Sequence, residues 1–211
     1  MPSPRTERLN FASSLDSASW IKSRLLPYER GEPPRFGHDV PSDYEKYIRI
    51  WHPPDGSINQ RVLGSLEDRA LGPLVSMLET ASNLESEECS FAFWERWGHL
   101  GENLQRLTGL RGWSPSVEQA ASFSLNEYRN YVLLTGPLSA LLIDDTWKLK
   151  LSPQFWWPEG KAWFVASEVD FGFTLIGADG PLASAMLARD DLETDEIEWS
   201  DVIDDFGDGV S

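Results

Sequence analysis

The chain has 211 residues, of which 41% are apolar, 12% aromatic and 25% charged. These values exclude a globally disordered chain, a collagen and a coiled-coil rod, and they suffice for one domain with a hydrophobic core. No apolar run approaches the roughly 18–20 residues of a membrane-spanning helix, and the first residues lack the pattern of a secretory signal. The net charge of −16 argues against direct nucleic-acid binding, because neutralising phosphates needs a surplus of Lys and Arg.

The acidic residues concentrate at the C-terminal end of the chain. Ten of the 34 lie in residues 190–211, which contain no Lys or Arg. We therefore expect a flexible N-terminus over 1–10, a single globular domain over 11–193 and an acidic amphipathic tail over 194–211. The single cysteine, Cys89, excludes an internal disulfide and favours a reducing, cytoplasmic location.

The first part of the domain is predicted to be mainly helical. Loosely spaced apolar residues predict a helix over 14–26, which ends at Pro27. A capping-box pattern followed by apolar residues at helical spacing predicts a second helix over 42–51. A third helix is predicted over 71–78, where Pro73 suits the first helical position.

The rest of the domain is predicted to be mainly strands. Runs rich in aromatic and β-branched residues predict strands over 89–94, 128–134, 162–171 and 173–176. A hairpin turn is expected at Glu159-Gly160, a short helix from Gly136 to Leu142, and a closing helix over 181–188. Together these elements predict an α+β fold, with helices packed around a central, mostly antiparallel sheet.

The acidic tail has a helical pattern of its own. Trp199, Val202, Ile203 and Phe206 fall at the spacing of one apolar helical face, and Asp195 precedes them as a candidate N-cap. A helix of about eleven residues is too short to be stable alone. The sequence therefore predicts that this segment docks, either on its own domain or on a basic partner.

The ten tryptophans form clusters that have two interpretations. In the first, Trp156, Trp157 and Trp163 are core residues that organise the fold, because each aromatic side chain buries a large apolar area. In the second, Trp94, Trp97, Trp156 and Trp157 form the wall of a pocket or a partner-binding patch, because tryptophan is frequent at interface hot spots.

No motif for nucleotide binding, serine hydrolysis or metal coordination is present, so no cofactor or metal is implied. The best polar group is Arg129 with Glu168 and Asp170, whose carboxylates share one face of a predicted strand. Such a pair suits acid–base chemistry or cation binding, or forms an ordinary surface ion pair with Arg129. His52 is a candidate general base, or a histidine at a helix end.

Several segments resemble a group of functionally uncharacterised, mainly actinobacterial proteins of about this length. They are Trp94-Glu95-Arg96-Trp97-Gly98, Arg129 through Leu138, and the block from Trp156-Trp157-Pro158 to Glu168-Val169-Asp170. This resemblance implies no activity and no catalytic residue. Val40 through Tyr47, and the strand and helix from Thr174 to Leu187, also resemble the SUKH superfamily of immunity and regulatory domains.

These observations favour a non-enzymatic, cytoplasmic protein-binding module, such as an immunity-like neutraliser of a basic protein. The alternative is a small-molecule sensor or enzyme with a Trp-walled pocket. The candidate binding residues are Trp94, Trp97, Arg129, Trp156, Trp157, Glu168, Asp170, Trp199, Val202, Ile203 and Phe206.

Overall fold

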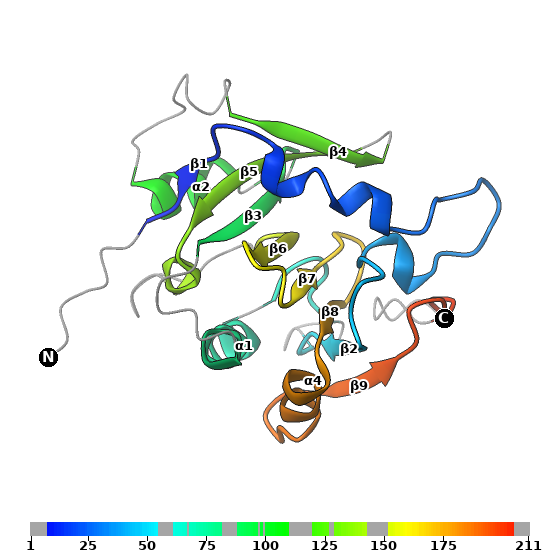
Figure 1. Cartoon of the computed structure of the whole chain (residues 1–211). Coiled ribbons are helices and arrows are strands. Elements are labelled where there is room, and N and C mark those ends of the chain that lie inside the picture. Colours follow the sequence, from blue (N-terminus) through cyan, green and yellow to red (C-terminus); the bar gives the residue numbers. More distant parts are fainter. Residues whose placement is uncertain are drawn as a thin grey trace, which may run out of the picture.

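An antiparallel sheet occupies the centre of the molecule (Figure 1). The computed structural model describes residues 8–54, 61–66, 68–81, 88–96, 98, 100–109, 120–126, 129–142 and 152–204. The strands are β1 (Asn10–Phe11), β2 (Lys46–Trp51), β3 (Cys89–Trp94), β4 (Ser122–Asn126), β5 (Arg129–Gly136), β6 (Phe155–Pro158), β7 (Phe164–Ala166), β8 (Phe173–Ala178) and β9 (Thr194–Ile197). Their order is β1-β5-β3-β6-β7-β8-β2-β9, and β4 also pairs with β5. The strand β9 therefore forms one edge of the sheet.

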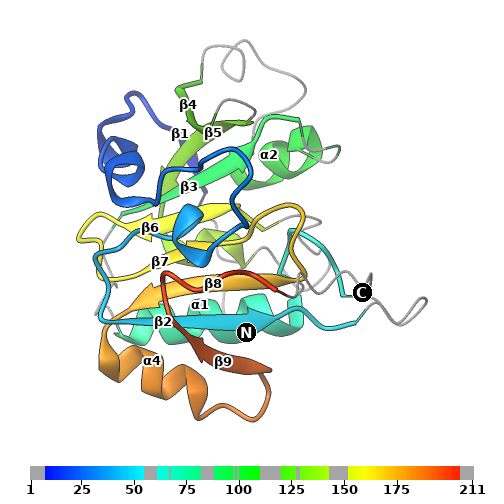
Figure 2. The same ribbon diagram turned by 90° about the vertical axis from the view of Figure 1, so that its right-hand side faces the viewer.

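Two layers cover the opposite faces of this sheet (Figure 2). The helices α1 (Asp68–Ala81), α2 (Leu100–Thr108) and α4 (Gly180–Leu187), with the 3₁₀ helix η4 (Leu138–Leu141), pack on one face. The other face is covered by the 3₁₀ helices η1 (Asp16–Ala18), η2 (Ile21–Arg24) and η3 (Phe36–His38), and by the chain after β9. The α+β prediction is confirmed.

The double cover explains why the central strands lack a polar face. On β6, Trp156 packs toward the helices while its neighbour Trp157 packs into the core under the 3₁₀ layer. On β3, Phe91 and Ala92 divide between the two cores in the same way. Since both faces are buried, continuous apolar runs replace the alternation of a half-exposed strand.

Several predicted elements are confirmed. The helix over 71–78 lies within α1, and the strand over 89–94 is β3. The turn at Glu159-Gly160 joins β6 to β7, which pair as the expected hairpin. The closing helix is α4, where the Asp179 side chain caps the first turn by accepting from the Leu182 amide at 2.9 Å.

The helix predicted over 42–51 is wrong, because residues 46–51 form the strand β2. Both of its edges pair, with β8 on one side and β9 on the other. Adjacent Tyr47 and Ile48 enter opposite cores, which a helix does not allow. Glu45 does not cap a helix here; its carboxylate accepts from the Gly180 amide at 3.1 Å, where α4 begins.

Two smaller helix predictions also need correction. Residues 14–26 form two short 3₁₀ helices, η1 and η2, rather than one α-helix. Their looser apolar spacing is consistent with this outcome, since only Ala18 and Ile21 are buried within these turns. In α1, Pro73 lies inside the helix and not at its first position, because the helix already begins at Asp68.

The strand predicted over 162–171 is shorter than expected. Only β7 is extended, and the chain turns at residues 168–171, where the Phe171 amide donates to the Glu168 carbonyl at 3.0 Å. The elements β1, η3, α2 and β4 were not predicted. The prediction of a flexible N-terminus over 1–10 is wrong for the last residues of this range, because Leu9 is buried and its amide donates to the Leu107 carbonyl at 2.9 Å. Residues 1–7 lie outside the described residues.

The acidic tail is not an amphipathic helix over its described part. Residues 194–197 are the strand β9, and the chain then crosses the sheet face toward η3. There the Trp199 indole donates to the Val40 carbonyl at 2.7 Å, and the Ile203 amide donates to the Pro34 carbonyl at 2.8 Å. These partners outweigh the helical spacing of the apolar residues, so residues 194–204 belong to the domain; Phe206 lies outside the described residues.

Candidate functional site

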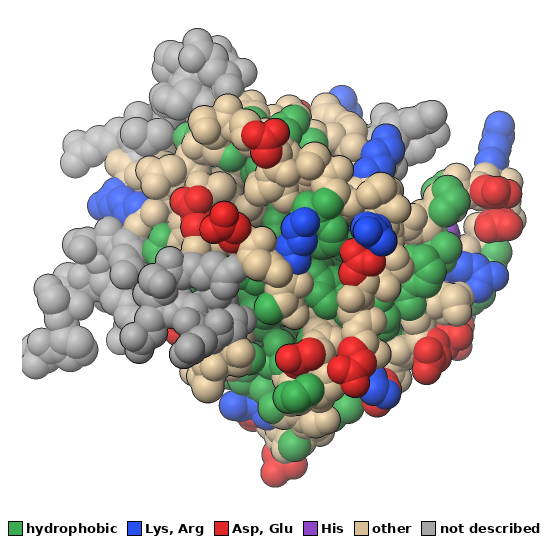
Figure 3. Space-filling view, in the orientation of Figure 1, with side chains coloured by type: hydrophobic (Ala, Val, Ile, Leu, Met, Phe, Trp, Pro, Cys, Tyr) green, Lys and Arg blue, Asp and Glu red, His purple; other side chains and the backbone are tan. Residues whose placement is uncertain are grey.

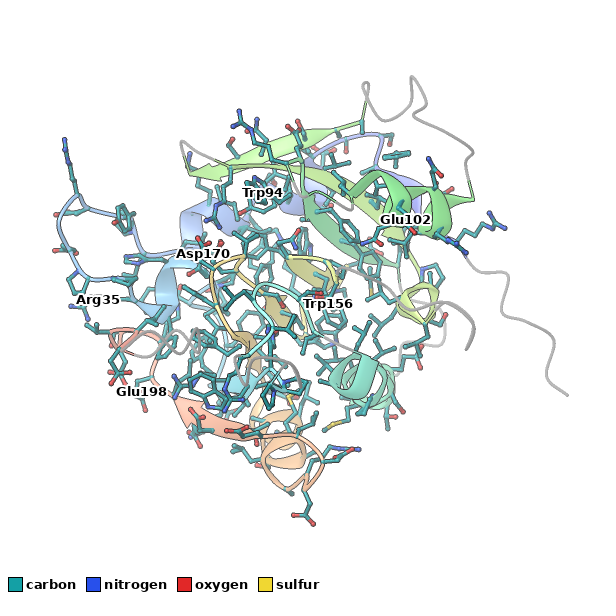
Figure 4. The ribbon with its side chains drawn as sticks, turned by 180° about the vertical axis from the view of Figure 1, so that it is seen from behind. Arg35, Trp94, Glu102, Trp156, Asp170 and Glu198 are labelled. Carbon is teal, nitrogen blue, oxygen red and sulfur yellow. The ribbon has the colours of Figure 1, made fainter. Side chains whose placement is uncertain are left out.

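Four of the predicted site residues come together at one flank of the sheet. Trp94 ends β3, Arg129 begins β5, and Glu168 and Asp170 lie in the turn after β7. The Arg129 guanidinium forms ion pairs with Glu168 and, at 2.6 Å, with Asp170, and it lies 5.5 Å from the centre of the Trp94 ring. Trp94 and Asp170 lie on the same flank in Figure 4.

The two carboxylates of this group differ in their surroundings. The Glu168 side chain is only 9% exposed and accepts from the Val169 amide at 2.6 Å, whereas the Asp170 side chain is 73% exposed. Asp39 is a third acidic neighbour. Burial raises the pKa of its carboxyl to about 7, against the opposing effect of the Arg129 charge.

This cluster has the geometry of a structural ion pair. The cation of Arg129 is already engaged by two carboxylates and an aromatic face. The other predicted wall residues lie elsewhere: Trp156 and Trp157 are in the two cores, and Trp97 is outside the described residues. Fully buried tryptophans cannot line an open pocket, so the described residues do not form the Trp-walled pocket.

A groove of about 650 Å³ lies at the β9 end of the sheet, between β9 and the chain that follows it. It is lined by Phe36, Arg49, Asp195, Glu196, Ile197, Glu198, Asp201, Val202 and Asp204. We call this site the acidic groove, because five of its lining residues carry carboxylates and one is basic. In Figure 3, acidic side chains gather at the lower part of the molecule, near β9.

The basic residue of the acidic groove is held in place by its neighbours. The Arg49 guanidinium lies 4.1 Å from the centre of the Trp51 ring, and its Nε donates to Asp195 at 2.9 Å. The Trp51 indole donates to the same carboxylate at 2.7 Å. Asp195 therefore neutralises Arg49 and is itself satisfied.

The remaining carboxylates of the acidic groove are less well compensated. Glu196 forms an ion pair with Lys46. Glu198, Asp201 and Asp204 are exposed and form no ion pair with any cation of the described residues. In Figure 4, Glu198 lies at the edge of the molecule beside β9. The groove thus carries a local excess of negative charge.

The predicted tail residues frame this groove. Val202 lines it and is 38% exposed, while Trp199 and Ile203 anchor the same segment to η3 and the chain before it. Phe36 and Arg49 were not predicted as site residues. The density of acidic residues after position 190 was the only signal in the sequence, and it did not indicate which distant residues would meet them.

His52 is neither a helix-end residue nor an exposed base. It follows β2 and is fully buried, with Nδ1 2.6 Å from the Val62 carbonyl oxygen and Nε2 2.8 Å from the Thr174 hydroxyl. Burial lowers the pKa of its imidazole to about 4. The side chain therefore stays neutral at physiological pH and joins β2 to β8.

We expect His52 to make folding pH-dependent. The folded state takes up its proton only near pH 4, whereas the unfolded chain does so near 6.5, so stability is lost as the pH falls between these values. From about pH 7 to about pH 5 the loss is about 2 kcal/mol. Urea unfolding at both pH values gives the free energy of unfolding of the wild type and of His52→Gln. The wild type should lose more of this free energy between the two pH values than His52→Gln does, and the difference between the two losses measures the contribution of His52. The Asp39 carboxyl, whose pKa is raised, stabilises the folded state as the pH falls, and it does so equally in both proteins, so its effect cancels in the comparison. Equal losses in the two proteins would contradict the assignment to His52.

Within the described residues, no group of three or more His, Cys, Asp or Glu side chains has the arrangement of a metal site. In the same part of the chain, every helix is too short or too polar to cross a membrane.

Comparisons with known proteins found no match to this chain among protein-family models, curated proteins or solved structures. The resemblances to the actinobacterial group and to the SUKH superfamily therefore stay predictions from short motifs.

Proposed function

We propose that this protein is a non-enzymatic, cytoplasmic protein-binding module that takes a basic segment of a partner protein into the acidic groove. The observation that carries the proposal is the set of three carboxylates, Glu198, Asp201 and Asp204, without an ion-pair partner among the described residues. They surround a concave surface with Phe36 and Val202. A lysine or arginine there gains charge complementarity together with apolar contact for its alkyl stem.

The framework of the acidic groove supports the same proposal. Arg49 of β2 lines the groove, and its side chain is held by Trp51 and Asp195. A side chain that is already held in place lowers the entropic cost of binding. A neutralising module of the immunity type would use these contacts to cover basic residues of its partner.

A charge-reversal variant tests this proposal. In the variant Glu198→Lys/Asp201→Lys/Asp204→Lys, we expect a labelled peptide of about nine alternating Lys and Val residues to bind at least about tenfold more weakly. Wild-type binding should also weaken as ionic strength rises from about 50 to about 300 mM. Fluorescence anisotropy measures both effects.

The matched control changes the same net charge elsewhere. Glu29, Glu95 and Glu159 are exposed and lie outside the groove, so replacing all three by lysine should change binding by less than about threefold. If the groove variant binds the peptide as tightly as this control, the acidic groove is not the binding site.

A further inference from the structure

The strand β9 leaves one of its edges unpaired among the described residues. It is the last strand in the sheet order and pairs only with β2. The Trp51 amide donates to the Glu193 carbonyl at 2.9 Å. This bond shows which residues of the β9 segment point their backbone groups toward β2, because such residues alternate along an antiparallel pair. Residues 193, 195 and 197 direct their backbone groups toward β2, so Thr194 and Glu196 direct theirs outward.

This edge has only part of the usual protection against pairing with another chain: β9 is short and carries the charged residues Asp195 and Glu196, but other protective features are missing. Natural sheets shield their edges with proline, with lysine, with bulges or with a covering segment. Residues 194–197 contain neither proline nor lysine, and they pair with β2 without a register shift. No described segment pairs with the outward groups of Thr194 and Glu196; α4 and the loop that joins it to β9 lie beside this end of the sheet in Figure 2 but form no ladder with the strand.

The acidic groove adjoins the same edge. Asp195 and Ile197 line the groove from β9 itself, and Glu198 follows directly. A strand added beyond β9 would lie about 4.8 Å from it and would direct every second side chain to the groove side. Of the carboxylates without an ion-pair partner among the described residues, Glu198 directly follows β9, so a basic residue of the added strand near this end of β9 would approach it.

We infer that the partner binds by strand addition: an extended segment of another protein, basic at alternate positions, pairs with the free edge of β9. The inference rests on the proposed function, since charge in the groove selects the partner. It adds the binding mode, in which outward backbone groups of Thr194 and Glu196 supply the hydrogen bonds and the groove supplies the charge contacts.

The peptide backbone provides the first test. The alternating Lys-Val peptide is compared with a peptide of the same sequence in which every second residue is N-methylated, at the positions whose amides would face β9. N-methylation removes these amide donors and keeps all charges. We expect N-methylation to weaken binding at least about tenfold. Hydrogen exchange should show new protection of the Glu196 amide with the unmodified peptide alone. Equal binding of both peptides would overturn strand addition.

The protein backbone provides the second test. In Glu196→Pro the outward amide is lost without removing a bond to β2, and Glu196→Gln is the matched control that removes the charge but keeps the amide. We expect the proline variant to bind at least about tenfold more weakly than the glutamine variant. If the proline variant does not fold, the N-methylated peptide gives the same information.

The outcomes separate the two proposals. If backbone changes have no effect but charge reversal abolishes binding, the groove binds a basic segment by another mode, and only strand addition fails. If charge reversal also has no effect, the proposed function fails as well. Loss of binding in both experiments supports both proposals.

Discussion

Replacing Trp163 by alanine should lower the free energy of unfolding by about 3–5 kcal/mol. The side chain is 0% exposed and packs edge-to-face against Trp156, with 5.7 Å between ring centroids. Truncation leaves a cavity between the sheet and the helical layer, because close-packed neighbours relax only partly. For a domain of this size, we expect the melting temperature to fall by roughly 10 °C or more, measured by circular dichroism.

Tyr28 provides the control for this experiment, because it is an aromatic residue with 65% exposure. Replacing it by alanine should change stability by no more than about 0.5 kcal/mol. If Trp163→Ala has the same melting temperature as the wild type, Trp163 is not a core residue and the two-core description of the sheet is wrong.

Replacing Arg129 by methionine should cost about 3–5 kcal/mol. The change leaves the Glu168 carboxylate buried, with the Val169 amide as its remaining donor among the described residues. A buried charge that loses its partner is strongly destabilising, since the interior replaces the lost solvation poorly. The double variant Arg129→Met/Glu168→Gln should recover much of the loss, because residue 168 then carries no buried charge. Urea unfolding of the three proteins measures the coupling.

Asp170 is the matched control in the same cluster. Its side chain is exposed, so its ion pair with Arg129 should contribute less than about 1 kcal/mol, and Asp170→Asn should be nearly neutral. Equal losses in Arg129→Met and Asp170→Asn would show that burial does not distinguish the two carboxylates.

The largest difference between sequence and structure concerns two segments with ambiguous periodicity. In residues 42–51 and 196–206 the apolar residues fit a helical stripe. In the first segment the strand β2 forms because β8 and β9 supply hydrogen-bonding partners on both sides. In the second, β2 pairs with residues 194–197, and η3 receives Trp199 and the residues after it. Pairing with distant segments outweighs local propensity here, as it often does.

The composition of the sequence predicted the character of the candidate site but not its location. The acidic residues after position 190 are evident from the sequence, and so is the pairing of Arg129 with Glu168 and Asp170 as one of two interpretations. The groove itself needs Phe36 and Arg49, which lie about 150 residues earlier in the chain. No spacing rule connects residues so far apart.

The sequence by itself determined the elements whose signals are local. They are α1 and α4, with their apolar spacing and cap, and the strands that are buried on both faces. Only the tertiary structure decided the conformation of β2 and β9, the division of Trp156 and Trp157 between two cores, and the free edge beside the acidic groove. Caps and periodicity depend on neighbouring residues, whereas strand pairing and edge position depend on partners that only folding brings together.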